Sequence, residues 1–189
     1  SSLLVSGNKI WVGTYEGLYV IEKGEKARCL VDGPEFYRLF ESSSGEVWAG
    51  CRTGGLYRIM PVEKVIWYSD SNAEPYHIES NQIRSFAEDR FGNIWFGTFL
   101  GLHKYNPYTD KFTVYRQDHL PGSLSHSYVF SVYIDAQATI WVGTYYGGAN
   151  YFNPEKEIIA QYTDNPFRKE CLNYSFVGHL AEDKNGNIW

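Results

Sequence analysis

The stretch FGNIWFGTFLGLHKYNP, residues 91–107, decides the fold, because most of it returns as ATIWVGTYYGGANYFNP at residues 138–154. Five tryptophans mark the same repeat, at spacings of 37, 47, 46 and 48 residues: Trp11, Trp48, Trp95, Trp141 and Trp189. A glycine follows two positions after each of the first four. Self-similarity at such a fixed period is the signature of a repeat architecture.

Each repeat is expected to hold four short strands separated by turn residues. In the third copy, residues 83–88 carry the aligned apolar residues Ile83 and Phe86 and lead into the turn EDRFGN, where Asp and Gly-Asn favour a hairpin. The following strands are expected at IWFGT (94–98), GLHKYN (101–106) and KFTVYR (111–116). Four antiparallel strands in each repeat predict an all-β fold, a β-propeller of four-stranded antiparallel blades.

The repeats predict a single partial β-propeller over residues 1–189, an arc of about four blades cut from a larger ring, with a small closed ring as the alternative. The expected boundaries are about 1–33 for blade 1, 34–70 for blade 2, 81–117 for blade 3, 127–164 for blade 4 and 175–189 for the start of blade 5. The repeated tryptophans are expected to be buried between neighbouring blades. The glycine two residues later would let the next blade approach closely.

Composition excludes several classes of protein. The net charge is −5 and the sequence has no basic stripe that could bind nucleic acid. No apolar run is long enough to span a membrane. The three cysteines Cys29, Cys51 and Cys171 lack the spacing of a zinc site and favour small buried thiols, although two of them could pair in an oxidising compartment. Their redox state therefore stays open.

The segment GNIWFGTFLGLHKYNPYTDKFTVYR (92–116), preceded by SNQIRSFAEDRF (80–91), resembles the two-component regulator propeller repeat. PGSLSHSYVFSVYID (121–135) resembles the loop and first strand that join blades in that family. Three departures concern blade details: DAQATIW (135–141) lacks the hairpin Gly-Asn, Cys51 replaces Thr, and Ala149 replaces Leu.

The resemblance implies an extracytoplasmic, periplasmic sensor segment of a membrane-spanning histidine kinase of Bacteroidetes type, often a hybrid kinase controlling polysaccharide use. The implied partners are an oligosaccharide or other small ligand and further propeller blades of the parent chain. A homodimer stays open, and membrane contact would come only through the parent protein. No cofactor or metal is expected.

The candidate ligand site lies on the face where the turns between the second and third strands meet the long loops that join blades. Large aromatic rings at turn tips suit an apolar sugar face, and His or Arg could bind hydroxyls or carboxylates. The candidate residues are Tyr15, Arg52, Phe99, Tyr145, Tyr146, His126 and Tyr174, with His77, His119 and Arg168 as weaker ones. The alternative is that these side chains only pack on the next blade.

Catalysis has less support in this sequence. It contains no nucleophile motif, metal-spaced histidine cluster or phosphate loop. The Glu-Asp pairs at 88–89 and 182–183 recur with the blade, which indicates solvated turn residues. We therefore expect no enzyme activity in this segment, with a propeller lyase or hydrolase and a protein-interaction scaffold as alternatives.

Overall fold

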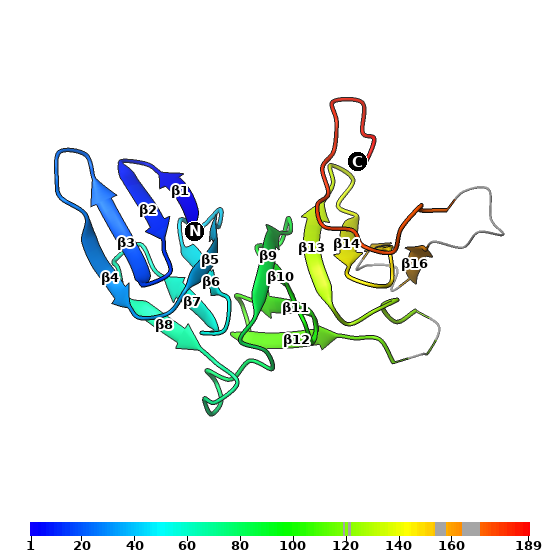
Figure 1. Ribbon diagram of the computed structural model, residues 1–189, viewed down its shortest axis with the longest axis horizontal. Coiled ribbons are helices and arrows are strands. Elements are labelled where there is room, and N and C mark those ends of the chain that lie inside the picture. The colour runs from blue at the N-terminus through cyan, green and yellow to red at the C-terminus, as the bar shows by residue number, and fades with distance from the viewer. Residues whose placement is uncertain (119, 121, 154–157, 164–170) are drawn as a thin grey trace. The chain divides into compact units, whose positions relative to one another are not determined.

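The computed structural model describes residues 1–118, 120, 122–153, 158–163 and 171–189 (Figure 1). The regular elements within these ranges are sixteen β-strands in four antiparallel sheets of four strands, as the propeller prediction requires. The chain forms two compact units, Ser1–Arg84 and Ser85–Trp189. The prediction of an all-β propeller is confirmed, with each sheet corresponding to one blade.

The first unit contains two sheets in which every strand pairs with the next along the chain. Its first sheet comprises β1 (Ser2–Ser6), β2 (Lys9–Gly13), β3 (Gly17–Glu22) and β4 (Arg28–Asp32). Its second comprises β5 (Phe36–Glu41), β6 (Val47–Cys51), β7 (Leu56–Ile59) and β8 (Val65–Tyr68). Tight turns between consecutive strands explain this simple order, since a hairpin needs only a few residues.

The second unit repeats the arrangement. One sheet comprises β9 (Ile83–Glu88), β10 (Ile94–Thr98), β11 (Gly101–Asn106) and β12 (Lys111–Tyr115). The other comprises β13 (Val129–Ile134), β14 (Ile140–Thr144), β15 (Ala149–Asn153) and β16 (Ile158–Tyr162). Strands expected at 94–98 and 101–106 therefore form at those residues, and the strand expected at 111–116 ends one residue early.

An aspartate organises the hairpin between the first two strands of a blade. The Asp89 carboxylate accepts the backbone N–H groups of Phe91 (2.9 Å) and Asn93 (3.0 Å) and the indole N–H of Trp95 (2.8 Å). Asp135 and Asp183 accept the indole N–H groups of Trp141 and Trp189 in the same way. Asp89 and Asp183 therefore lie in turns, as predicted for the Glu-Asp pairs, but half-buried Asp89 also ties its turn to the core.

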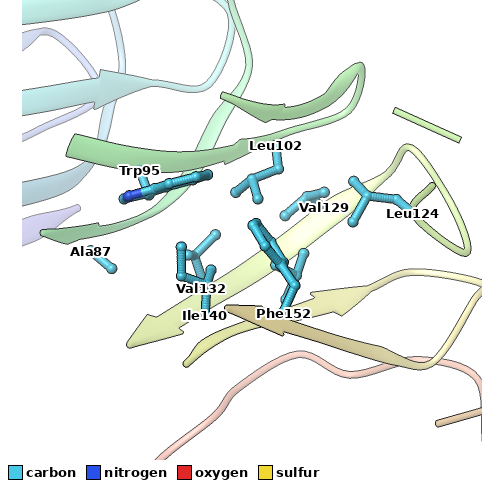
Figure 2. Packing of buried hydrophobic residues seen from close by; sticks show 9 residues of the cluster. Ala87, Trp95, Leu102, Leu124, Val129, Val132, Ile140 and Phe152 are labelled. Atoms are coloured by element: carbon cyan, nitrogen blue, oxygen red, sulfur yellow. The ribbon is translucent and has the colours of Figure 1, made fainter. Parts of the chain in front are cut away.

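The core of the second unit lies between its two sheets (Figure 2). Trp95 is fully buried, and its ring meets Phe152 of the facing sheet edge-on, with centroids 5.7 Å apart. The cluster consists of Ala87, Trp95, Leu102, Leu124, Val129, Val132, Ile140, Val142 and Phe152. Trp95 thus packs between neighbouring blades, as the repeat predicted.

The first unit has an equivalent core between its two sheets. Trp11 is 4% exposed there and belongs to a cluster with Phe36 and Val47 of the second sheet. A methyl group added at Gly13 would lie 2.9 Å from the Cβ of Phe36, and one added at Gly97 would lie 2.7 Å from Val129. These contacts are too short for a side chain, so the glycines permit the close approach of the next blade, as expected.

One expectation about burial was wrong. Trp141 is only half-buried: it stacks on Tyr151 and Tyr162 of its own sheet and borders a cavity of about 410 Å³ that Trp189 also lines. Within 171–189, where the start of a fifth blade is predicted, the chain forms a hairpin turn with a single bridge between Glu182 and Ile188.

The cysteines also differ from one another in their surroundings. Cys51 lies in the core, where burial raises the pKa of its thiol to about 12. Cys29 is exposed, because its position on β4, the fourth strand of its sheet, faces solvent. All three thiols are free in the structure. The expectation of buried thiols therefore holds for Cys51 and was wrong for Cys29.

Candidate ligand site

The second unit gathers aromatic side chains where the β10–β11 and β14–β15 turns meet the segments that precede β13 and follow β16. We call this group the aromatic cluster. It consists of Phe99, His126, Tyr128, Phe130, Tyr145, Tyr146 and Phe176. Four of these residues are sequence-predicted candidates, and they come from two turns and one long loop.

The rings of the aromatic cluster form a continuous series of contacts. Phe99 stacks on Tyr128 with centroids 5.1 Å apart, and His126 meets the edge of Tyr128 at 4.9 Å. His126 also contacts Tyr146 at 5.3 Å, and Tyr146 contacts Tyr145 at 4.5 Å. Offset and edge-to-face pairs at these distances are the favourable geometries for aromatic rings.

Two phenylalanines extend the series at its other end. Phe176 meets Tyr145 at 5.1 Å and Phe130 at 5.1 Å, both edge-to-face. Phe130 lies at a β-bulge, where the pairing of β13 with β14 shifts register between Val129 and Ser131. A bulge re-aims the side chain it carries, which brings the Phe130 ring toward this group.

Backbone hydrogen bonds fix the turns that carry these rings. The N–H of Tyr145 donates to the Tyr128 carbonyl at 2.9 Å, and the N–H of Val177 donates to the Thr144 carbonyl at 3.0 Å. The hydroxyl of Thr144 also donates to the Gly148 carbonyl at 2.9 Å and closes the turn. These hydrogen bonds hold both ends of the turn in place. The aromatic residues are therefore preorganised, which limits the conformational entropy lost when a ligand binds.

His126 is a neutral hydrogen-bond donor in this group. Its Nδ1 accepts the backbone N–H of Tyr128 at 3.0 Å, so the ring proton resides on Nε2. Burial lowers the pKa of His126, which keeps the ring uncharged at neutral pH. A neutral imidazole N–H beside aromatic rings is suited to a hydroxyl group of a ligand.

The aromatic cluster is partly open to solvent. Tyr146 is 61% exposed, whereas Tyr145, Tyr128 and Phe176 are about 40% exposed. Their contacts with one another nevertheless bury part of each ring, so both packing and ligand contact are available to the same side chains.

The remaining candidates are arranged differently. Tyr15 is 69% exposed in the β2–β3 turn of the first unit, and Arg52 of the same unit forms an ion pair with Glu35 at 3.5 Å. Tyr174 is 75% exposed and takes part in none of the ring contacts described above. The Nδ1–H of His77 donates a hydrogen bond to the Asn72 carbonyl at 3.1 Å, because a carbonyl oxygen can only accept. His77 therefore stabilises its own loop.

His119 and Arg168 lie outside the described residues. Sequence reasoning missed Tyr128, Phe130 and Phe176. A signal for them was present, because Tyr128 and Phe176 both stand directly before the aligned apolar residue that opens a blade, at Val129 and Val177. The alignment was used only for its apolar positions, so the aromatic residues beside them were not considered.

The structure offers no obvious metal centre in the part of the chain it describes: no group of three or more His, Cys, Asp or Glu side chains is placed to hold an ion. The same residues include no helix that could cross a membrane.

Comparison with known proteins supports the repeat assignment. Residues 77–99 match the two-component regulator propeller family. Histidine kinase P4 of Formosa agariphila is 32% identical to this chain over 135 residues, which is 65% of this chain and 9% of that kinase. The chain therefore spans about a tenth of the length of this curated relative.

Solved structures share the fold at low sequence identity. The extracellular domain of a hybrid two-component system of B. thetaiotaomicron aligns with 100% of this chain and 25% of its own, with a TM-score of 0.74 and 22% identity. Virginiamycin B lyase from Staphylococcus aureus aligns with 99% of this chain and 61% of its own, with a TM-score of 0.70 and 16% identity. Both likenesses establish the propeller fold. The sequence match to the two-component regulator propeller repeat is confined to residues 77–99.

Proposed function

We propose that this chain is a ligand-sensing, extracytoplasmic propeller segment of a two-component sensor histidine kinase. The parent protein would reside in the inner membrane, expose this segment to the periplasm and control transcription when an oligosaccharide binds. The similarity to histidine kinase P4 and to an extracellular domain of a hybrid two-component system supports the sensor class. The aromatic cluster supports the ligand class.

The observation that carries the proposal is the ring series from Phe99 to Phe176. A sugar presents an apolar face of C–H groups and a rim of hydroxyls, and aromatic rings bind the face while a few polar groups bind the rim. Tyr145 and Tyr146 offer both a ring and a hydroxyl, and they are partly exposed. His126 adds a neutral N–H donor beside them.

We propose that this segment itself has no enzyme activity. The likeness to virginiamycin B lyase shows the fold alone, at 16% identity. Propeller folds carry many functions, so activity must come from a site. The aromatic cluster holds no carboxylate pair among its members, whereas glycoside hydrolysis needs two. The tests below distinguish this proposal from two alternatives, a propeller lyase or hydrolase and a protein-interaction scaffold.

The test is calorimetric titration of the parent sensor with a panel of oligosaccharides. The double substitution Tyr145→Ala with Tyr146→Ala should weaken the binding of the cognate oligosaccharide at least tenfold, about 1.4 kcal/mol. An aromatic pair can contribute about 0.5 to 1.5 kcal/mol beyond its buried area. Tyr108→Ala is the matched control, since Tyr108 is 84% exposed in the β11–β12 turn.

Product analysis of the same mixtures distinguishes the alternatives. Saturable binding without cleavage, lost in the double variant and kept in the control, supports the sensor. Bond cleavage that disappears when a single carboxylate is replaced would establish an enzyme. Unchanged affinity in the double variant would show that these tyrosines serve blade packing, and binding only to protein would establish a scaffold.

A further inference from the structure

The first unit carries a group of positive side chains around one tyrosine. Strand β5 has a β-bulge at Tyr37, because its pairing with β6 shifts register between Phe36 and Arg38. The guanidinium carbon of Arg38 lies 4.3 Å from the centroid of the Tyr37 ring, and that of Arg84 lies 5.4 Å from it. Two guanidinium groups thus share one aromatic ring. A cation over an aromatic face is attracted by the ring quadrupole.

Arg52 is the third positive side chain of this group. Burial lowers the pKa of the Arg84 guanidinium, and the positive charges of Arg52 and Arg38 lower it further, although the neighbouring Tyr37 raises it. The backbone N–H of Arg52 donates to the carbonyl of Glu35 at 3.0 Å, which places Arg52 beside the start of β5, close to Tyr37. We call Tyr37, Arg38, Arg52 and Arg84 the arginine cluster.

The contacts of the arginine cluster hold like charges together. The Nε–H of Arg38 donates to the backbone carbonyl of Arg84 at 3.0 Å, which fixes the Arg38 side chain next to that residue. Glu35 forms an ion pair with Arg52 at 3.5 Å. Glu35 thus pairs with Arg52, whereas Arg38 and Arg84 share the Tyr37 ring, in a chain whose net charge is −5.

The position of the arginine cluster corresponds to that of the aromatic cluster in the repeat. Tyr37 and Phe130 both lie at a bulge eleven residues before the blade tryptophan, and Arg52 and Tyr145 both lie four residues after it. The backbone N–H of Arg52 donates to the Glu35 carbonyl at 3.0 Å, as that of Tyr145 donates to Tyr128. Equivalent turn positions of the repeat therefore carry a guanidinium group in the first unit, at Arg52, and an aromatic ring in the second, at Tyr145.

We propose that the arginine cluster binds an oxyanion, the carboxylate or sulfate group of an acidic ligand such as an acidic sugar. A bound oxyanion would relieve the repulsion among the guanidinium groups and accept their N–H donors. Arginine is suited to this task, because its planar fork can give two parallel hydrogen bonds to a carboxylate or sulfate. Arg38 and Arg52 are exposed, so a ligand can reach them from solvent.

Titration of the purified chain with small probes tests this site without an oligosaccharide. The probes are sodium sulfate and sodium glucuronate, with glucose as the neutral control and ionic strength held constant with sodium chloride. Calorimetry should show saturable binding of at least one anion and none of glucose. Arg38→Gln and Arg52→Gln should each weaken that binding at least tenfold while leaving the melting temperature within a few degrees.

Two further variants make the outcome specific. Glu35→Gln removes the carboxylate beside Arg52 and should tighten anion binding, which a purely structural role of these arginines does not predict. Arg90→Gln is the matched control, since Arg90 is also exposed and stacks on an aromatic ring, with its guanidinium carbon 4.9 Å from the centroid of Phe91. If only sulfate binds, the recognised group is a sulfate, and if only glucuronate binds, it is a carboxylate.

The proposal is overturned if neither anion binds, or if Arg38→Gln and Arg52→Gln bind both anions as the Arg90→Gln control does. This result would leave the proposed sensor function standing, because the aromatic cluster belongs to the other unit and is tested with neutral oligosaccharides. Loss of oligosaccharide binding in the tyrosine double variant, conversely, says nothing about the anion site.

Discussion

Replacing Ala138 by glycine should stabilise the protein, although it removes a methyl group. Ala138 has φ of 63° in the hairpin between β13 and β14. The corresponding hairpin position, three residues before the blade tryptophan, is glycine in three of the four other copies: Gly45, Gly92 and Gly186, with φ of 78°, 76° and 82°. The hairpin geometry thus imposes a left-handed conformation that suits glycine.

The magnitude follows from two opposing terms. A side chain in the left-handed region costs about 1 to 2 kcal/mol. Glycine also gives the unfolded chain more freedom, which costs about 0.4 to 1 kcal/mol. Ala138→Gly should therefore raise the free energy of unfolding by about 0.5 to 1 kcal/mol. Asp135 keeps the turn intact in both proteins, because its carboxylate accepts the N–H of Thr139 at 2.8 Å.

Urea unfolding followed by tryptophan fluorescence measures this difference, and an unchanged m-value shows that stability alone has changed. The reverse substitution Gly92→Ala is the matched control. A methyl group there would meet nothing nearer than 3.8 Å, at Pro107, so its cost would be conformational only. Destabilisation by Ala138→Gly, or no loss of stability on Gly92→Ala, would refute the reasoning.

Two further predictions concern buried side chains. Trp95→Ala should cost about 3 to 5 kcal/mol by urea unfolding, the usual cost of truncating a buried aromatic, and a loss under about 1 kcal/mol would contradict its place between blades. Burial lowers the pKa of His103 to about 4. The unfolded chain therefore binds a proton first, and stability should fall by about 3 kcal/mol as the pH drops from about 6.5 to about 4. His103→Leu should remove this part of the pH dependence of urea unfolding, and an unchanged slope would contradict it.

The all-β blades could be predicted from the sequence because their signals are local. Strand and turn residues recur with each copy, and the strand pattern depends on neighbours a few residues apart. The strand at residues 94–98 was predicted at its observed bounds for this reason. The indole of Trp95 and its glycine partner Gly97 likewise keep their expected roles, since every copy must pack on the next one.

The candidate site could be predicted only in part. The turn and loop residues Phe99, His126, Tyr145 and Tyr146 were found from their place in the repeat. Tyr128 and Phe176 were missed although both stand directly before an aligned apolar residue, because the repeat pattern marks their positions but not which way their rings point.

The tertiary structure decided what the repeated positions contact. Arg38 and Arg84 are 46 residues apart, and only long-range packing within the first unit places them around Tyr37. Trp141 has the same sequence signature as Trp95 and yet is half-buried, because burial depends on the sheet that faces it. Periodicity therefore determined the blades, whereas long-range packing determined which side chains meet and which remain open to a ligand.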